Sequence, residues 1–161
     1  MGAVFVTGAT GTVGSAVVKH LLELGQPVIA GIRDPHDAGR VPDAAEARAF
    51  SFDDPPAGTE HALAGADRLF LMRPPAIADV QAKLFPVIDA ALRRGIGQIA
   101  FLSLQGVQAN RKTPHHAVEK YLREVRSPYT FLRPNFFMQN LSSTYAGPIR
   151  DRGEIFVHTG R

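Results

Sequence analysis

Three glycines near the N-terminus are the first residues whose spacing indicates chemistry. Gly8, Gly11 and Gly14 follow the apolar, β-branched run Ala3–Thr7 and precede a segment whose apolar residues recur at helical spacing from Val13. Glycines at a strand-to-helix turn let the backbone approach a ligand, and the free N–H groups of the helix suit a pyrophosphate there. The alternative is a tight turn in which the glycines serve packing alone. The predicted ligand-binding residues of this turn are Gly8, Thr10, Gly11, Thr12, Val13 and Gly14.

A single arginine gives the second signal. Arg33 directly follows the predicted strand Pro27–Ile32, which ends without an acidic residue. In a dinucleotide-binding fold this strand end faces the adenosine ribose, where a carboxylate selects NAD(H) and an arginine pairs with the 2′-phosphate of NADP(H). We therefore expect NADP(H) to be preferred, with NAD(H) as the alternative cofactor if Asp34 turns inward. A solvated Arg33 paired with Asp34 is the alternative without a ligand.

These residues need a scaffold to position them, and the sequence predicts one in which strands and helices alternate. Short apolar runs predict strands over Ala3–Thr7, Pro27–Ile32, Arg48–Phe52, Arg68–Met72, Gln98–Leu102 and Tyr129–Leu132. Helical patterns predict helices over Val13–Leu24, Thr59–Leu63, Ile77–Leu92 (kinked by Pro86) and Pro114–Val125, with a polar crossover over Asp34–Ala45. This alternation indicates a parallel sheet with helices on both faces, the Rossmann-type, doubly wound α/β class.

Composition limits the classes of protein to which the chain can belong. With 161 residues, 45% of them hydrophobic, one core-forming domain over residues 1–161 is expected. The absence of cysteine excludes disulfides, thiolate metal sites and a cysteine nucleophile, and it fits a reducing cytoplasm. The net charge of +3 comes from scattered basic residues, so nothing predicts nucleic-acid binding, and no stretch predicts a membrane span. The six histidines lack the spacing of a metal site, so no metal is expected.

Several further stretches resemble a known family. TGATGTVG resembles the short-chain dehydrogenase/reductase superfamily, and later stretches resemble its atypical, NmrA-like members: GIRDP, ALAGADRLFLMRPP, IAFLSLQG, PHHAVEKYLRE and YTFLRPNFFMQNL. The resemblance implies either an NAD(P)H-dependent reductase of quinones and related compounds or a cofactor-binding regulator without turnover. It also implies that relatives continue well past GEIFVHTGR into a lobe that closes over the substrate. That substrate lobe is expected to be largely missing here.

The resemblance implies contacts at both ends of the cofactor. After the third strand, relatives place an aspartate against adenine, whereas this sequence has Ser51, so adenine contact is expected to rest on the backbone of Ser51 and Phe52. After the sixth strand, Asn135 and Phe136 are expected beside the nicotinamide. The adjacent rings of Phe136 and Phe137 would then wall a pocket for a flat acceptor. Without the family, two adjacent phenylalanines are more often core residues.

The predicted helix Pro114–Val125 carries the candidate catalytic residues. Short-chain dehydrogenases use a Tyr-x-x-x-Lys pair, but aligning this helix puts His115 at the lysine position and Arg111 at the tyrosine position, so the pair is absent. His115 and Glu119 lie one turn apart beside the apolar stripe. His115, oriented by Glu119, is expected to bind ribose or to supply a proton. A surface histidine with a helical partner is the alternative.

Ser103 completes the candidate set, because it matches the active-site serine of the superfamily at the end of the fifth strand. Its alternative is a strand-end serine that caps a loop. His116 and Lys120, on the opposite side of the helix, are expected to face solvent.

The expected function is an NADPH-binding oxidoreductase that reduces a quinone or a similar conjugated carbonyl. The alternative is a non-catalytic NADP(H)-binding redox sensor that signals through a protein partner.

Overall fold

A parallel sheet of six strands forms the centre of the computed structural model, which describes residues 2–155. The strands are β1 (Ala3–Val6), β2 (Val28–Ile32), β3 (Glu46–Ala49), β4 (Ala66–Met72), β5 (Gln98–Leu102) and β6 (Tyr129–Leu132). Their order in the sheet is β3-β2-β1-β4-β5-β6, so the chain moves outward in one direction from β1 and in the other direction from β4. The expected Rossmann-type, doubly wound class is confirmed.

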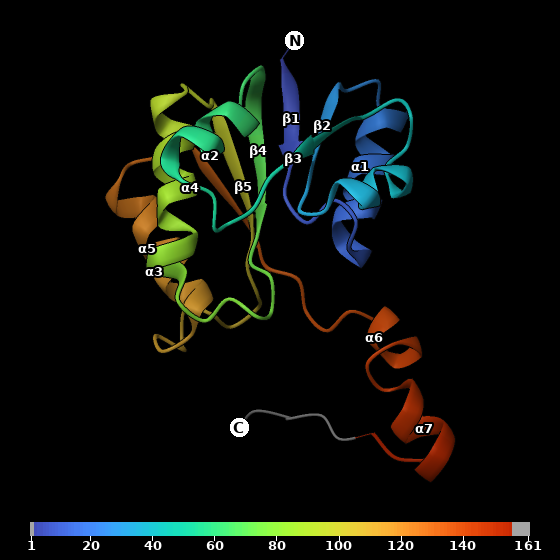
Figure 1. Cartoon of the computed structure of the whole chain (residues 1–161). Helices are drawn as coiled ribbons and strands as arrows, with labels where there is room; N and C mark the ends of the chain where they lie inside the picture. The colour runs from blue at the N-terminus through green and yellow to red at the C-terminus, as the bar shows by residue number, and fades with distance from the viewer. Residues whose placement is uncertain (1, 156–161) are drawn as a thin grey trace.

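Helices pack on both faces of this sheet (Figure 1). One face carries α1 (Thr12–Glu23) and the 3-10 helix η1 (Pro35–Arg40). The other face carries α2 (Pro56–Ala62), α3 (Val80–Lys83), α4 (Phe85–Arg93) and α5 (Pro114–Glu124). After β6, the short helices α6 (Gln139–Ser142) and α7 (Ala146–Arg152) extend away from the sheet.

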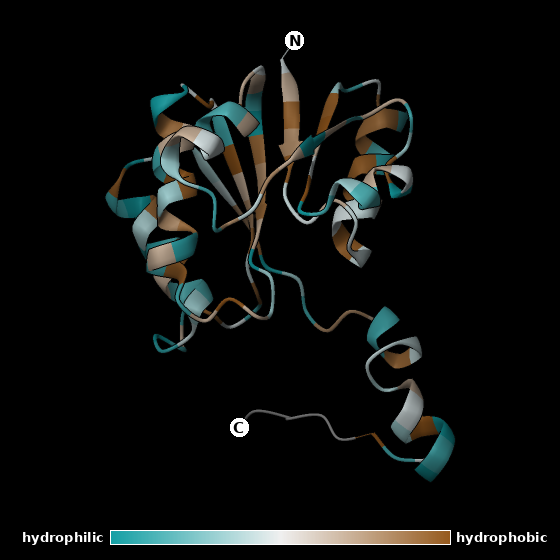
Figure 2. Ribbon diagram, viewed as in Figure 1, coloured by the Kyte–Doolittle hydropathy of each residue, from teal (hydrophilic) through white to brown (hydrophobic). Residues whose placement is uncertain are grey.

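The alternation of side chains along the strands divides the core into two layers. In β1, Phe5 points into the cluster shared with α2 to α5, whereas Val4 and Val6 point into the cluster shared with α1. A strand buried on both faces is apolar at every position, as this one is. Figure 2 shows hydrophobic residues along the central strands and polar residues on the outer sides of the helices. The layers hold the carboxyl ends of the strands at one common edge.

The third strand lies earlier in the chain than the sequence predicts. Strand β3 covers Glu46–Ala49 instead of Arg48–Phe52, because its register pairs these residues with Ile29–Ile32 of β2. The chain then turns at Ser51, whose N–H donates to the carboxylate of Asp54 (2.7 Å). Residues after Ala49 therefore enter the edge of the sheet as a loop.

The helix predicted over Ile77–Leu92 is two helices, α3 and α4. It begins only at Val80, because the Asp79 side chain accepts from the Ala82 N–H (3.0 Å) and caps α3. Pro86 has no N–H to continue the ladder, so the expected kink is a break at Leu84. Helix α2 also starts at Pro56 instead of Thr59, and the sequence patterns assigned neither α6 nor α7.

Candidate functional site

The first strand ends in a turn that requires glycine. Thr7 is buried, and its hydroxyl donates to the Phe70 carbonyl (3.1 Å) and accepts from the Met72 N–H (2.9 Å), which ties the ends of β1 and β4 together. Gly8 follows in a left-handed conformation with φ of +63°, and a Cβ there would lie 2.6 Å from the Met72 sulfur. The backbone therefore leaves β1 with no side chain over the edge of the sheet.

The N-terminus of α1 is open toward this turn. Gly11 is its N-cap, with no capping side chain, and its first turn holds no acidic residue. The Gly11 N–H donates to the Gly8 carbonyl (3.0 Å), and a Cβ at Gly14 would lie 2.0 Å from that carbonyl oxygen. Gly14 thus lets the helix pack against the turn. The amides of Thr12, Val13 and Gly14 have no intrahelical acceptor, and with the helix dipole they suit a phosphate group.

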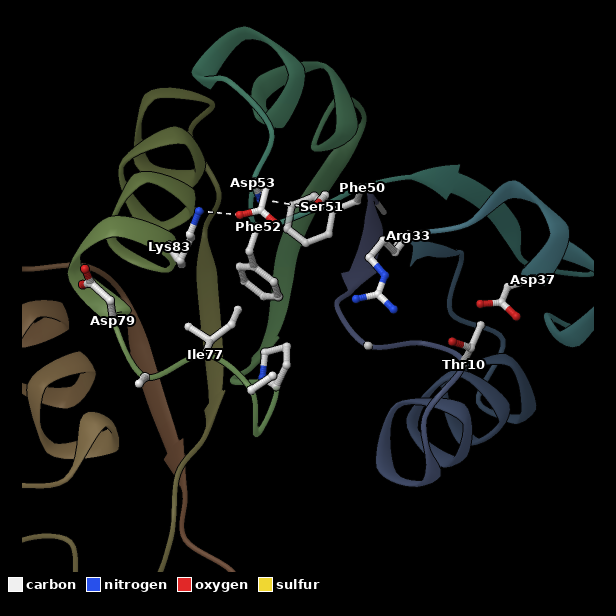
Figure 3. A pocket seen from close by; sticks show the side chains of 15 residues that line it. Thr10, Arg33, Asp37, Phe50, Ser51, Phe52, Asp53, Ile77, Asp79 and Lys83 are labelled. Carbon is white, nitrogen blue, oxygen red and sulfur yellow. Dashed lines mark hydrogen bonds and ion pairs between the residues drawn. The ribbon is translucent and has the colours of Figure 1, made fainter.

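A cavity of about 630 Å³ lies beside this turn, where the sheet reverses between β1 and β4. In open parallel sheets, ligands bind in the crevice at this reversal. Figure 3 shows side chains from the ends of several strands around the cavity. The predicted cofactor-binding residues that line it are Gly8, Thr10, Arg33, Ser51 and Phe52.

One wall of the cavity is apolar and aromatic. Phe50 contacts Phe5 and Phe52 edge to face, with ring centroids 5.3 and 5.1 Å apart. Phe50, Phe52 and Ile77, the last from the loop after β4, line the cavity together. A wall of this kind suits a flat aromatic heterocycle such as adenine.

The Ser51 backbone has a partner within the chain. Its N–H donates to Asp54, and its hydroxyl accepts from the Asp53 N–H (3.1 Å). These bonds close a short turn beside the aromatic wall. The backbone of Ser51 and Phe52 was expected to contact adenine, but the Ser51 N–H is already occupied by Asp54.

Charged side chains gather on the side of the cavity near β2. Arg33 is exposed directly after β2 and lines the cavity. The Asp34 carboxylate accepts from the His36 N–H (2.9 Å) and caps η1, which does not favour the alternative in which Asp34 pairs with Arg33. The acidic residue that lines the cavity here is Asp37.

Arg40 links Asp37 to the glycine turn. Its guanidinium donates to the Asp37 carboxylate (3.0 Å) and to the Thr10 carbonyl (2.9 Å). Thr10 and Asp37 both line the cavity, so this bridge fixes the spacing between the turn and η1.

A second ion pair lies on the opposite side, between Lys83 of α3 and Asp53 after β3, and both residues line the cavity. The hydrogen bond from Lys83 lowers the pKa of Asp53 below its ordinary value. Sequence reasoning missed Lys83 and Asp37 as site residues. Lys83 is 30 positions from its partner, so no local pattern connects them.

A buried carboxylate forms a separate polar centre at the ends of β5 and β6. Glu119 of α5 is 1% exposed and accepts from the Ser103 hydroxyl (2.7 Å), from Arg133 (2.8 and 2.7 Å) and from Arg123 (2.9 Å). Burial raises the pKa of Glu119, but the hydrogen bonds from Arg133 and Ser103 outweigh burial, so the pKa is lowered overall. Glu119 is therefore a buried anion next to the apolar stripe of α5.

His115 is half-buried, with its ring centroid 6.0 Å from that of Phe101. Burial lowers the pKa of His115, the charge of Arg73 lowers it further, and Glu119 opposes both. The neutral imidazole is therefore favoured near neutral pH. The hydrogen bonds of Glu119 in the described residues run to Ser103 and the arginines, so the expected orientation of His115 by Glu119 stays a prediction. The catalytic roles of His115, Glu119 and Ser103 stay predictions.

The neighbouring His116 also departs from expectation. It is half-buried, and its Nδ1 lies 3.2 Å from the Val107 carbonyl oxygen, whereas the sequence predicted that it faces solvent. Helix α5 packs the loop after β5 against this ring. Lys120 is exposed, as expected, and pairs with Glu124 (3.4 Å).

Asn135 and Phe136 lie outside the main cavity, in the segment between β6 and α6. Both are exposed; the Asn135 carboxamide oxygen accepts from the Phe136 N–H (2.8 Å), and the Phe136 ring lies 5.7 Å from that of Tyr145. A smaller hollow of about 200 Å³ separates α1 from α6 and is lined by Thr12, Val13, Ala16, Phe137, Gln139, Asn140 and Ser143. The nicotinamide contacts of Asn135 and Phe136 stay predictions.

Residues 2–155 lack two other kinds of feature. No helix there is long and apolar enough to cross a membrane. No group of three or more potential ligands there is arranged to hold a metal ion.

Comparison with known proteins agrees with the geometry of the cavity. Residues 8–159 match the NAD(P)H-binding family. The chain is 31% identical over 163 residues to an NAD(P)H azoreductase from Xenophilus azovorans, covering 98% of this chain and 56% of the relative.

Solved structures give the same result. A Citrobacter sp. triphenylmethane reductase complexed with NADP(H) has a TM-score of 0.75 and 28% identity, over 90% of this chain and 55% of that one. An NADPH-dependent quinone oxidoreductase from Escherichia coli has a TM-score of 0.72 and 28% identity, over 89% and 52%. The chain thus spans about half the length of these relatives. It belongs to the NAD(P)H-binding family of NmrA-like, atypical short-chain dehydrogenases/reductases.

Proposed function

We propose that this chain is the cofactor-binding part of an NADPH-dependent reductase whose acceptor is a quinone or a similar conjugated carbonyl. The observation that carries the proposal is the cavity at the sheet reversal, which is lined by Arg33 and by Gly8 and Thr10 of the glycine turn. This turn leads directly into the open N-terminus of α1. The similar reductases act on azo compounds, triphenylmethane or quinones, as their names state. Extended aromatic or conjugated systems are the common feature of these acceptors.

Each part of the cofactor has a matching group in this arrangement. The 2′-phosphate pairs with the Arg33 guanidinium in a charge-assisted hydrogen bond, and the pyrophosphate lies on the amides of Thr12 to Gly14. Adenine lies on the wall formed by Phe52 and Ile77. When bound, the cofactor supplies the hydride that reduces the acceptor.

The chain's own residues supply binding and a proton near the reacting end. A neutral His115 holds the nicotinamide ribose or, when protonated, donates to the acceptor oxygen. The Ser103 hydroxyl donates to Glu119, so this pair holds the carboxyl end of β5 against α5. Reduction of a quinone requires few catalytic side chains, because water also supplies protons.

Two observations favour a second function. The Ser103 hydroxyl, at the position of the superfamily's active-site serine, donates to buried Glu119 and is not free to bind a substrate oxygen. Arg111 stands where the catalytic tyrosine would be and is exposed. Both features suit an NADP(H)-binding redox sensor that signals to a protein partner without turnover.

The two functions are separated by measuring NADPH oxidation over a panel of quinones, azo dyes and triphenylmethane dyes. A reductase shows acceptor-dependent loss of NADPH absorbance, faster with NADPH than with NADH. The His115→Ala variant is expected to lower kcat about 10²-fold, whereas Lys120→Ala, on the exposed side of the same helix, leaves kcat unchanged. Binding of NADPH without oxidation by any acceptor contradicts the reductase and supports the sensor.

A further inference from the structure

We propose that Asp37 and Arg40 set how strongly the site discriminates NADP(H) from NAD(H). The Asp37 carboxylate repels the 2′-phosphate, and the positive charge of Arg40 offsets that repulsion. This inference rests on the proposed function, which puts the 2′-phosphate beside Arg33. It concerns a pair of residues whose charges tune the preference that Arg33 creates.

The first step is the position of Asp37. It lines the same cavity as Arg33, Thr10 and Gly31, and its side chain is 33% exposed. In Figure 3, the Asp37 carboxylate and the Arg33 guanidinium are turned toward the same space above Thr10. A carboxylate therefore borders the region in which a phosphate next to Arg33 has to lie.

The other nearby carboxylates are held away from this role. Asp34 caps η1 through the His36 amide, and Asp53 pairs with Lys83 on the opposite side of the cavity. Among residues 2–155, the Asp37 carboxylate binds Arg40 alone, whose side chain is 61% exposed. Exposed ion pairs of this kind are weak, so a doubly charged phosphate competes with Asp37 for the Arg40 guanidinium.

The second step is the anchoring of Arg40. One arm of its guanidinium donates to Asp37 and the other to the Thr10 carbonyl in the glycine turn, 30 residues away in sequence. Arg40 thereby brings a second positive charge to the side of the cavity that holds Arg33. Without Arg40, the Asp37 carboxylate faces the cavity without its ion-pair partner.

These charges act in opposite directions on the two cofactors. A 2′-phosphate is repelled by Asp37 and attracted by Arg33 and Arg40, whereas the neutral 2′-hydroxyl of NAD(H) is a hydrogen-bond donor to a carboxylate. Removing the charge of Asp37 therefore strengthens NADPH binding without strengthening NADH binding. Removing the positive charge of Arg40 weakens NADPH binding.

The test is the ratio of the NADPH and NADH dissociation constants in Asp37→Asn, Arg40→Gln and the double variant, measured by fluorescence titration. Asp37→Asn is expected to bind NADPH about three- to tenfold more tightly, with NADH unchanged or weaker. Arg40→Gln is expected to bind NADPH weaker by a similar factor, and the double variant to return toward the parent. Each change should shrink at high salt. Asp43→Asn, an exposed acid outside the cavity, is the matched control and should leave the ratio unchanged.

An unchanged ratio in Asp37→Asn overturns the inference while the proposed cofactor site stands. Equal weakening of both cofactors in Asp37→Asn also overturns it, because that result assigns Asp37 a structural role in holding Arg40. A parent protein that binds neither cofactor contradicts the proposed function itself, and the inference falls with it.

Discussion

Among single residues, the buried Glu119 joins more elements than any other side chain described above. Its carboxylate accepts from Ser103 after β5, from Arg133 after β6 and from Arg123 on α5. A buried anion is stable only while its partners remain, because burial removes the water that would otherwise solvate it. Glu119 therefore fixes the carboxyl ends of two strands relative to the helix that carries His115.

We expect Glu119→Gln to lower the free energy of unfolding by about 2–4 kcal/mol, since Arg133 and Ser103 lose a charged acceptor. Urea denaturation measures this change. Glu124→Gln, which breaks an exposed pair with Lys120, is the matched control and should cost less than about 1 kcal/mol. Equal effects of the two substitutions would show that the buried cluster adds no stability.

The same residue makes stability depend on pH. The pKa of Glu119 is lowered in the folded protein from an ordinary value of 4.5, so the unfolded chain binds more protons below that value. The stability that Glu119 contributes is therefore complete above pH 4.5 and is lost as the pH falls further. The difference in the free energy of unfolding between the parent and Glu119→Gln is therefore expected to become smaller as the pH falls below 4.5.

At the scale of elements, the glycines of the turn between β1 and α1 have different roles. Gly14 allows close packing, whereas Gly11 is expected to face the ligand. A Cβ at Gly14 would lie 2.0 Å from the Gly8 carbonyl oxygen, whereas one at Gly11 would lie 3.3 Å from it. Gly14→Ala should therefore destabilise the fold by about 2 kcal/mol or more. Gly11→Ala should cost less than about 1 kcal/mol and still weaken NADPH binding, because its methyl group enters the space of the pyrophosphate. Urea unfolding and NADPH titration of both variants test this, and normal NADPH binding by Gly11→Ala would leave the turn a packing feature.

The elements that the sequence predicted best are those with local signals. Strands β5 and β6 have the predicted bounds, and the glycine turn joins its strand and helix as the spacing of Gly8, Gly11 and Gly14 indicated. The apolar stripe over Ile77–Leu92 was also sound, since Val80, Leu84 and Ile88 are buried. Periodicity continues across the break at Leu84, so it does not reveal where one helix ends and the next begins.

The charged residues around the cavity were not predictable from local sequence signals. The bonds from Arg40 to Thr10 and from Lys83 to Asp53 each join residues 30 positions apart. Glu119 pairs with Arg133 across 14 positions and two elements. Such pairs depend on how the strands are ordered in the sheet, and a single sequence carries no periodic signal for them. Sequence therefore indicated Arg33 and missed the charges around it.

At the scale of the whole molecule, the sheet and its cavity account for cofactor binding, while the relatives are about twice as long as this chain. The glycine turn, the aromatic wall and Arg33 all come from β1 to β4 and the loops that follow them. We therefore infer that cofactor binding is a property of this part of the fold and that NADPH binds at the reversal of the sheet between β1 and β4.

The most direct test of that claim is an NADPH titration of the protein followed by amide chemical-shift NMR. We expect saturable shifts at Gly8, Gly14, Arg33 and Phe52, with little change along β6 at the edge of the sheet. NADH should give the same pattern with weaker affinity and a smaller shift at Arg33, because it lacks the 2′-phosphate. Shifts that do not saturate, or that gather away from the cavity, would contradict the account.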